Sequence, residues 1–300
     1  MITRTSPLWL PPPELLPASR TALRDGARSP LAPPDPAGPL PDPRDADYDA
    51  YFGVARTRRA PAAALARALL TTTAEVSAWA GPADRRALGG ALTVCRLLPS
   101  PPPARPASPP SSAGTAGMAG TAGEQALARW KAGHRLFLAL TQAVVVALRD
   151  ATAPGAPHHP GRPAGHDAAV LLRACAAAMR ATASFTPHAY ETAVRPSMTP
   201  PRREREGFSG LWSADHRTLV AELRRWGSAH SAACAAGCEA VRDLADALAE
   251  VHAAHHGVCA RFVGAGPSLL GGGDSALHTL DRLAAARGGL LTPLGKETRR

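Results

Sequence analysis

The sequence predicts an all-α protein, and three observations support this class. Alanine supplies much of an apolar fraction of 45%, whereas aromatic residues make up only 4%. Long stretches of Ala, Leu, Arg and Glu favour helices because these side chains lose little rotamer freedom there. The alternating β-branched residues that strands need are almost absent. With 300 residues, the chain is long enough to bury a full hydrophobic core.

The first part of the chain is predicted to contribute little to that core. Residues 1–58 are rich in Pro, Arg and Asp, and an arm of this composition is expected to be disordered. A helical domain over 59–290 follows, with helical patterns over 61–81 and about 84–98. Residues 99–123 are a low-complexity loop, and 291–300 form a basic tail.

A long core helix is predicted to begin at Glu124. Its apolar positions follow 3,4 spacing and define one face: Leu127, Trp130, His134, Phe137, Thr141, Val144 and Leu148. The most apolar run, 136–148, is too short to span a bilayer and contains Gln142, so no membrane contact is expected. His134 therefore lies on the inward face of a buried helix.

Four further helices are predicted in the C-terminal half. One runs over about 167–183, and a short helix with a long Pro/Gly-rich loop follows it. Ser213 offers an N-cap for the next helix. The last long helix runs to about Val263, and its inward seam has 3,4 spacing: Val241, Leu244, Leu248, Val251, His255, Val258 and Phe262. His255 thus occupies a position where the pattern requires an apolar residue.

Composition also limits the partners. The net charge is +10, but the arginines are scattered and no nucleic-acid-binding motif accompanies them, so no nucleic-acid partner is expected. The five cysteines form no dense framework, and the N-terminus lacks an apolar secretory segment. We therefore expect a reducing, cytoplasmic environment. A homodimer is the default expectation for the oligomeric state.

Four nitrogen and sulfur donors lie close together in "HAAHHGVCARF": His252, His255, His256 and Cys259. Zinc is one interpretation, because these positions share a helical face. A zinc protease needs a glutamate where Ala253 stands, however, and structural zinc sites usually draw ligands from separate elements. Surface or satisfied core histidines are another interpretation.

Haem fits the same residues better. A single inward histidine on an apolar helix seam is how a proximal haem ligand is presented. Cys259 lies one turn beyond His255, where a thiol could reach a vinyl group of the porphyrin. The usual CxxCH signature is missing, so the attachment would be a single thioether.

The spacing then resembles a known family. The chain has His216, then thirty-eight residues, and then "HHGVC" from His255 to Cys259. This pattern resembles the HxnHxxxC signature of bacterial haem-dependent tyrosine hydroxylases. Within that family the pattern is most similar to the 3-methyl-L-tyrosine hydroxylases of saframycin-type pathways, and the wider superfamily is that of the tryptophan/indoleamine dioxygenases. The resemblance covers about residues 124–265.

The resemblance implies a role for several residues. "HHGVCARFV" resembles the proximal helix, with His255 as the axial iron ligand and Cys259 as the thioether donor. "HRLFLALTQAVVVAL" resembles the distal helix, with His134 as an acid/base at the substrate phenol or bound oxygen. His216 is implied as a second axial ligand or catalytic residue. "PHAYETAVRPSM" resembles the element whose arginine, here Arg195, binds the substrate carboxylate.

The substrate pocket and the reaction follow from the same resemblance. "GFSGLWSADH" resembles a loop that closes the pocket, and the implied substrate-binding residues besides Arg195 are Tyr190, Phe208, Ser209, Gly210 and Trp212. The implied activity is a haem monooxygenase that hydroxylates L-tyrosine or 3-methyl-L-tyrosine ortho to the phenol, giving a catechol for antibiotic biosynthesis. The co-substrate is either O2 with a reductant or H2O2.

Other functions remain open from the sequence. A haem dioxygenase acting on tryptophan or another indole shares the fold, and a bis-His haem sensor would use His216 and His255 as permanent ligands. Each implied residue also has a structural alternative: His134 as a core histidine, His216 beside a helix cap, and Arg195 paired with Glu191 four residues earlier. Cys234 and Cys238, like His158 and His159, are expected to be inert.

Overall fold

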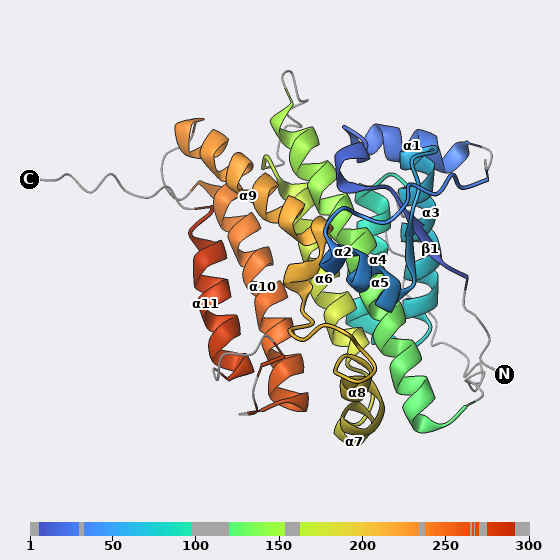
Figure 1. Cartoon of the computed structure of the whole chain (residues 1–300). Coiled ribbons are helices and arrows are strands. Elements are labelled where there is room, and N and C mark those ends of the chain that lie inside the picture. Colours follow the sequence, from blue (N-terminus) through green and yellow to red (C-terminus); the bar gives the residue numbers. More distant parts are fainter. Residues whose placement is uncertain are drawn as a thin grey trace, which may run out of the picture.

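The computed structural model describes residues 6–29, 33–97, 120–153, 163–233, 238–264, 266, 268–269 and 275–291. Within these residues the chain is a bundle of helices with a small sheet at one side, as Figure 1 shows. The helices are α1 (Arg20–Arg28), α2 (Pro43–Phe52), α3 (Pro61–Ser77), α4 (Pro82–Val94), α5 (Ala122–Thr152), α6 (His166–Thr182), α7 (Pro187–Ala189), α8 (Arg195–Ser197), α9 (Ala214–Ala233), α10 (Glu239–Phe262) and α11 (Ala276–Gly288). The predicted all-α class is confirmed.

The centre of the bundle is the long helix α5. Thr121 and Glu124 cap its N-terminus reciprocally, each side chain hydrogen-bonding the other's backbone N–H. From Leu138 to Leu148 every residue is at most 3% exposed. By length and composition α5 could cross a membrane, but 83% of its most apolar window is buried inside the protein. It is therefore the core helix that the sequence predicts.

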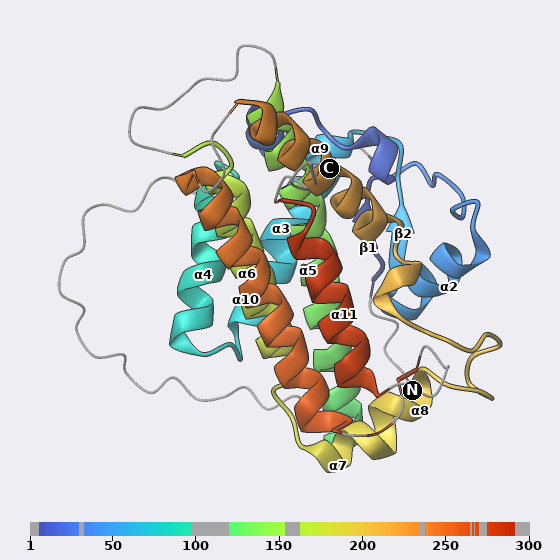
Figure 2. The same ribbon diagram turned by 90° about the vertical axis from the view of Figure 1, so that its left-hand side faces the viewer.

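Helix α6 lies between α5 and α10 and is built for close packing (Figure 2). Most of its buried side chains are alanines, which bring the helix axes near one another. On α5, Gly133 faces Thr182 of α6 so closely that a Cβ at Gly133 would overlap the threonine hydroxyl. Helix α10 packs on the other face of α6, and α11 packs against α10 at the outer edge.

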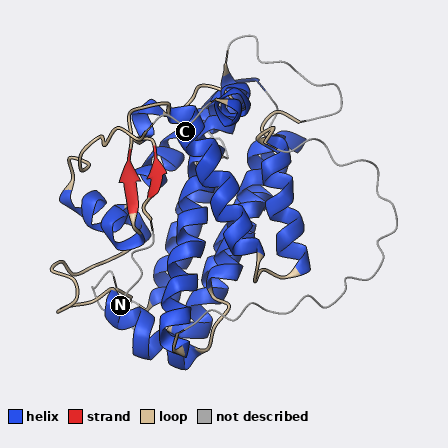
Figure 3. Ribbon diagram, turned by 90° about the vertical axis from the view of Figure 1, so that its right-hand side faces the viewer, coloured by secondary structure: helices blue, strands red, loops and turns tan. Residues whose placement is uncertain are grey.

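The described part of the N-terminal segment, residues 6–29 and 33–58, is ordered, which corrects the prediction of a disordered arm over 1–58. Strands β1 (Leu8–Leu10) and β2 (Val54–Arg56) pair in parallel, and α1 and α2 lie between them in the chain. Figure 3 shows this sheet beside the bundle. Leu10 and Leu23 are fully buried, and Tyr51 is 1% exposed. The segment is stabilised by contacts with residues far along the chain, which its own composition does not reveal.

The other element boundaries agree closely with expectation. The Ser213 hydroxyl accepts a hydrogen bond from the His216 backbone N–H at 3.3 Å, so Ser213 caps α9 as predicted. The last long helix begins at Glu239 and ends at Phe262. The loop predicted over 99–123 and the tail predicted over 291–300 lie almost entirely outside the described residues, as do His158, His159 and Cys234.

Candidate active site

A cavity of about 230 Å³ lies where α5, α9, α10 and α11 meet the loop before α9. Its lining is mainly apolar and aromatic, with three histidines, one cysteine and two arginines. The residues that line it are Tyr48, Phe52, Trp130, His134, Phe137, Met179, Tyr190, Arg195, Met198, Phe208, Ser209, Gly210, Leu211, His216, His255, Cys259, Val263, Ser268, Leu269, Ala276, Thr279, Leu280, Leu283 and Arg287. An apolar pocket with a few convergent polar groups is the usual form of a small-molecule site.

Helix α10 presents His255 and Cys259 to the cavity, one helical turn apart. Burial lowers the pKa of His255 to about 4, and the neighbouring His252 contributes to the same shift. The imidazole is therefore neutral at physiological pH, with a lone pair available. Burial also raises the pKa of the Cys259 thiol to about 11, so the thiol stays protonated.

His134 of α5 lines the same cavity, and its protonation state is set by its surroundings. Its Nδ1–H donates to the backbone carbonyl of Trp130 at 2.8 Å, which leaves Nε2 as the ring nitrogen with a lone pair. Phe52 stacks on the imidazole at 4.5 Å between ring centroids. Burial lowers the pKa of His134 to about 4, so the ring is a neutral hydrogen-bond acceptor.

His216 enters the cavity from the first turn of α9. Its Nε2 lies 2.7 Å from the Nη2 of Arg287, and because a guanidinium can only donate, His216 accepts this hydrogen bond. Burial and the nearby Arg287 lower the pKa of His216 to about 3. His216 is thus a neutral imidazole, and its Nε2 lone pair is engaged by α11.

Most of the predicted substrate-binding residues line the cavity. Tyr190 and Arg195 lie at the two ends of a π-helical turn, a distortion often found at functional sites. Burial raises the pKa of Tyr190 to about 12, against the opposing effect of the Arg195 guanidinium. Phe208, Ser209 and Gly210 line the cavity from the loop before α9.

Trp212 is placed differently from this expectation. It does not line the cavity but packs behind it, with its ring centroid 5.6 Å from that of Phe208. Its side chain is 7% exposed, and the Arg44 guanidinium lies 6.0 Å from its ring. Trp212 therefore supports Phe208 instead of contacting a ligand. The adjacent Leu211, for which the sequence predicts no role, lines the cavity.

The four donors of "HAAHHGVC" do not converge on one point. Within the described part of the chain, no three His, Cys, Asp or Glu side chains are placed to hold one metal ion together. His256 is outside the cavity lining, and its Nε2 lies 3.9 Å from Asp281 of α11. The geometry gives no support to a zinc site made by these residues.

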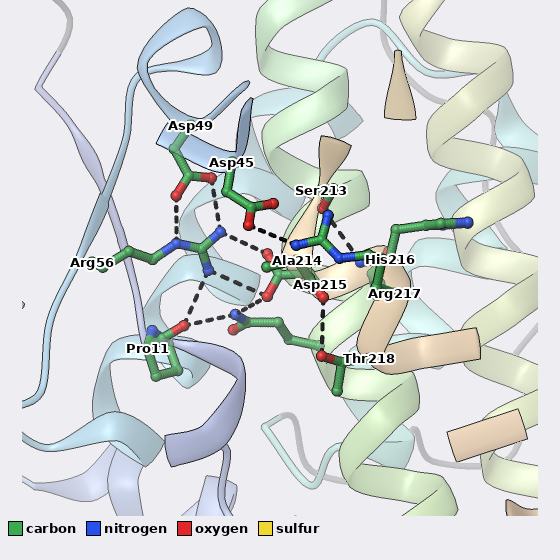
Figure 4. Close-up of polar contacts among 12 residues, drawn as sticks. Pro11, Asp45, Asp49, Arg56, Ser213, Ala214, Asp215, His216, Arg217 and Thr218 are labelled. Carbon is green, nitrogen blue, oxygen red and sulfur yellow. Dashed lines mark hydrogen bonds and ion pairs between the residues drawn. The ribbon is translucent and has the colours of Figure 1, made fainter. Parts of the chain in front are cut away.

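A buried ionic network fixes the start of α9 from the N-terminal segment (Figure 4). Arg56 of β2 forms two hydrogen bonds to Asp49, at 2.7 and 2.8 Å, and two to Asp215, at 3.2 and 2.9 Å. Asp215 is fully buried and also accepts from Gln142 of α5 at 2.8 Å. Burial disfavours a charged Arg56, but the two carboxylates outweigh it and raise its pKa. This network holds the residue next to His216.

Comparison with known proteins identifies the family. The family model described as SfmD 3-methyl-L-tyrosine peroxygenase matches residues 6–255. The chain belongs to this family. It is 35% identical over 275 residues to the 3-methyl-L-tyrosine peroxygenase of Streptomyces lavendulae, covering 84% of this chain and 73% of that protein.

A solved structure agrees with the family assignment. The crystal structure of reduced SfmD, soaked with sodium hydrosulfite, matches with a TM-score of 0.58 and 27% identity, covering 85% of this chain and 98% of that one. The family predicted from the HxnHxxxC spacing is confirmed. The predicted extent of the resemblance, 124–265, is wrong at its N-terminal end, because the match begins at residue 6 and so includes the ordered segment.

Two groups of cavity residues are not predicted by the sequence. Tyr48 and Phe52 come from the segment predicted to be disordered, and Arg287 comes from α11, for which no role is predicted. The spacing of Tyr48 and Phe52, i and i+4 before a glycine, is a helical signal that could have been used. Arg287 carries no comparable local signal.

The acid sensitivity of folding should depend measurably on His134. Its pKa is about 4 in the folded chain, against an ordinary value of 6.5, so between these values only the unfolded chain binds the proton. Protonation of His134 in the unfolded chain therefore lowers the free energy of unfolding as the pH falls from about 6.5 to about 4. The total loss is roughly 3 kcal/mol, and above about pH 6.5 there is none. Urea unfolding of the apoprotein and its His134→Gln variant, from about pH 7 to about pH 4, measures the difference.

The exposed histidine on α10 supplies the control for this titration. The His256→Gln variant should follow the wild-type pH curve, because its side chain is 44% exposed and outside the cavity. Parallel curves for the wild type and the His134→Gln variant would mean that His134 is not a buried neutral imidazole.

Proposed function

We propose that this protein is a haem-dependent peroxygenase that hydroxylates the ring of L-tyrosine or 3-methyl-L-tyrosine ortho to the phenol, giving a catechol. The observation that supports this most is the meeting of His134, His216, His255 and Cys259 in one apolar cavity of a chain whose relative is named a 3-methyl-L-tyrosine peroxygenase. The proposed setting is a cytoplasmic step of an antibiotic pathway. The reaction consumes H2O2: one of its oxygen atoms is inserted into a ring C–H bond to give the new hydroxyl, and the other leaves as water.

The residues of the cavity suit a haem. A metal-binding histidine must be neutral, and the lowered pKa of His255 keeps it so. No described residue hydrogen-bonds to the His255 ring, so this histidine would be available to hold the haem iron. Cys259 is an uncharged thiol one turn away, suited to a thioether with a vinyl group. A bound haem would supply the oxidising chemistry, activating peroxide for oxygen transfer.

His134 would act on the substrate phenol. Because Nδ1–H is committed to the Trp130 carbonyl, Nε2 can accept a hydrogen bond from the phenol hydroxyl. A neutral acceptor at this point orients the ring and can take the phenol proton as the ring is oxidised. The stacked Phe52 and the neighbouring Trp130 hold the imidazole in place, with ring centroids at 4.5 and 4.3 Å.

Arg195 and Tyr190 would bind the amino-acid end of the substrate. A guanidinium presents a planar fork that matches a carboxylate, and Arg195 lines the cavity beside Tyr190. Phe208, Ser209 and Gly210 close the cavity on the loop side and exclude water from the ring. In this proposal the aromatic ring lies among the aromatic side chains and the carboxylate lies at Arg195.

His216 is the proposed second iron ligand of the resting state. Its Nε2 is the unprotonated nitrogen, as metal binding requires, but it is engaged by Arg287 at 2.7 Å. That hydrogen bond must break before His216 can bind iron. When it is not bound to iron, the His216 imidazole would be a neutral base able to accept a proton from peroxide.

The covalent attachment is tested by acid-acetone extraction followed by mass spectrometry. Wild-type protein should retain a haem-sized adduct, and the Cys259→Ala variant should release its haem. The Cys238→Ala variant is the matched control, because Cys238 is partly buried at the start of α10 and outside the cavity. Peroxide-driven formation of catechol from L-tyrosine or 3-methyl-L-tyrosine should follow in the wild type.

Two results of this experiment would contradict parts of the proposal. If haem can be extracted from both the wild type and the Cys259→Ala variant, the proposed thioether is wrong but the proposed haem site stands. A wild-type protein that binds no haem, even after reconstitution, removes the proposed function itself.

A further inference from the structure

Helix α11 closes one side of the cavity with a single face. Thr279, Leu283 and Arg287 follow one another at four-residue intervals and all line the cavity. Ala276 is the one residue of α11 that is classed as buried, and the helix packs against α10 at the edge of the bundle. The region matched by the family model ends at residue 255, before this helix begins.

Arg287 is the charged member of that face. Its one described side-chain hydrogen bond goes to His216 Nε2, which is a neutral acceptor. Burial lowers the pKa of Arg287, and no carboxylate offsets this effect among the described residues. Other arginines of this protein pair well: Arg56, Arg20 and Arg173 each bind two carboxylates. Arg287 differs from these three in having no described carboxylate partner.

The titratable groups that Arg287 influences are neutral imidazoles. His216, His252 and His255 are each close enough for Arg287 to lower their pKa. The Nε2 of His252 is buried and has no hydrogen-bond partner among the described residues. His216, His255 and Arg287 all line the cavity, and its described lining contains no carboxylate.

A half-buried guanidinium with unused donors is costly unless an anion pairs with it. We propose that Arg287 forms a carboxylate-binding subsite at the α11 side of the cavity, separate from Arg195. This inference rests on the proposed function, because that function supplies the two carboxylates the cavity could receive. One is a propionate of the haem, and the other is the α-carboxylate of the amino acid. The planar fork of Arg287 suits either one.

Two pairs of probes distinguish the sources. Hemin and hemin dimethyl ester differ only in the propionates, and each is titrated into full-length protein in the Cys259→Ala background, which keeps binding reversible. L-tyrosine and L-tyrosinamide differ in the α-carboxylate, and each is measured by equilibrium dialysis against haem-loaded protein. Both pairs are applied to wild type, Arg287→Gln, Arg287→Lys and Arg282→Gln.

We expect Arg287 to be needed for binding one of the two carboxylates and not the other. Arg287→Gln should weaken binding of the acid form of one pair by on the order of tenfold, while its ester or amide is unaffected. Arg287→Lys should recover part of this loss because it keeps the charge. Arg282 lies on the exposed face of α11 outside the cavity, so Arg282→Gln should bind as the wild type does.

The outcomes separate the subsite from the proposed function. If Arg287→Gln binds both acid probes as tightly as Arg282→Gln does, the carboxylate subsite is wrong even though haem binds. If wild type binds no hemin, the proposed function fails, and the L-tyrosine pair on the apoprotein then decides the subsite alone. Equal weakening of acid and ester, or of acid and amide, would overturn the subsite by assigning Arg287 a purely structural role.

Discussion

Replacement of His255 by alanine should leave the protein folded and almost free of haem, because iron binding must position the porphyrin before the Cys259 thioether can form. The imidazole faces a cavity and no described residue hydrogen-bonds to it, so its removal costs little packing. Loss of a group that only hydrogen-bonds to a metal ligand typically lowers metal affinity by about 10–100-fold. Loss of the ligand itself should lower the affinity by more than this. Peroxide-driven hydroxylation should fall to background.

The Soret absorbance per mole of purified protein measures this prediction, and far-ultraviolet circular dichroism checks the fold. The control is the adjacent residue: His256→Ala removes an exposed imidazole on the same helix and should keep both haem and activity. Added imidazole should partly restore the Soret band of His255→Ala, because it can occupy the space of the lost ring. A normal haem content in His255→Ala would remove His255 as the ligand.

Breaking the buried ionic network should have the largest effect on stability. The Arg56→Met variant keeps the aliphatic stem but leaves Asp49 and Asp215 buried without their cation, which should cost about 3–5 kcal/mol of unfolding free energy. The ordered N-terminal segment and the start of α9 should both loosen, because Arg56 joins them (Figure 4). Urea unfolding followed by circular dichroism measures the change.

An exposed ion pair offers a matched control. Arg205 lies 2.8 Å from Asp47, with side chains 48% and 41% exposed, so Arg205→Met should cost less than about 1 kcal/mol. The double variant Arg56→Met/Asp215→Asn should be more stable than Arg56→Met, because one unpaired carboxylate is removed with its partner. If Arg56→Met and Arg205→Met destabilise equally, the network does not stabilise the fold.

Loosening of the network should also reach the cavity. Asp215 is adjacent to His216, and Phe52, which stacks on His134, ends the α2 helix that precedes β2. The N-terminal segment thus supports the site from two directions. The same variant should therefore bind haem less tightly, to a degree that Arg205→Met does not.

The sequence by itself determined those features that depend on local periodicity. The 3,4 spacing of apolar residues placed His134 and His255 on inward faces, because helical geometry makes positions three and four apart share a side. Ser213 was recognised as a cap because the first turn of a helix leaves backbone N–H groups without partners. The HxnHxxxC spacing was specific enough to predict the family correctly.

Tertiary structure alone decided how charged and distant residues are used. Arg56 looks like a solvent-exposed charge until Asp215, 159 positions away, is placed beside it. In the same way Arg287 is a cavity residue because α11 packs on α10, and Trp212 lies behind Phe208 because of the fold of the loop before α9. Such pairings depend on long-range contacts, whose formation no local pattern records. This is why an ordered segment rich in Pro, Arg and Asp was predicted to be disordered.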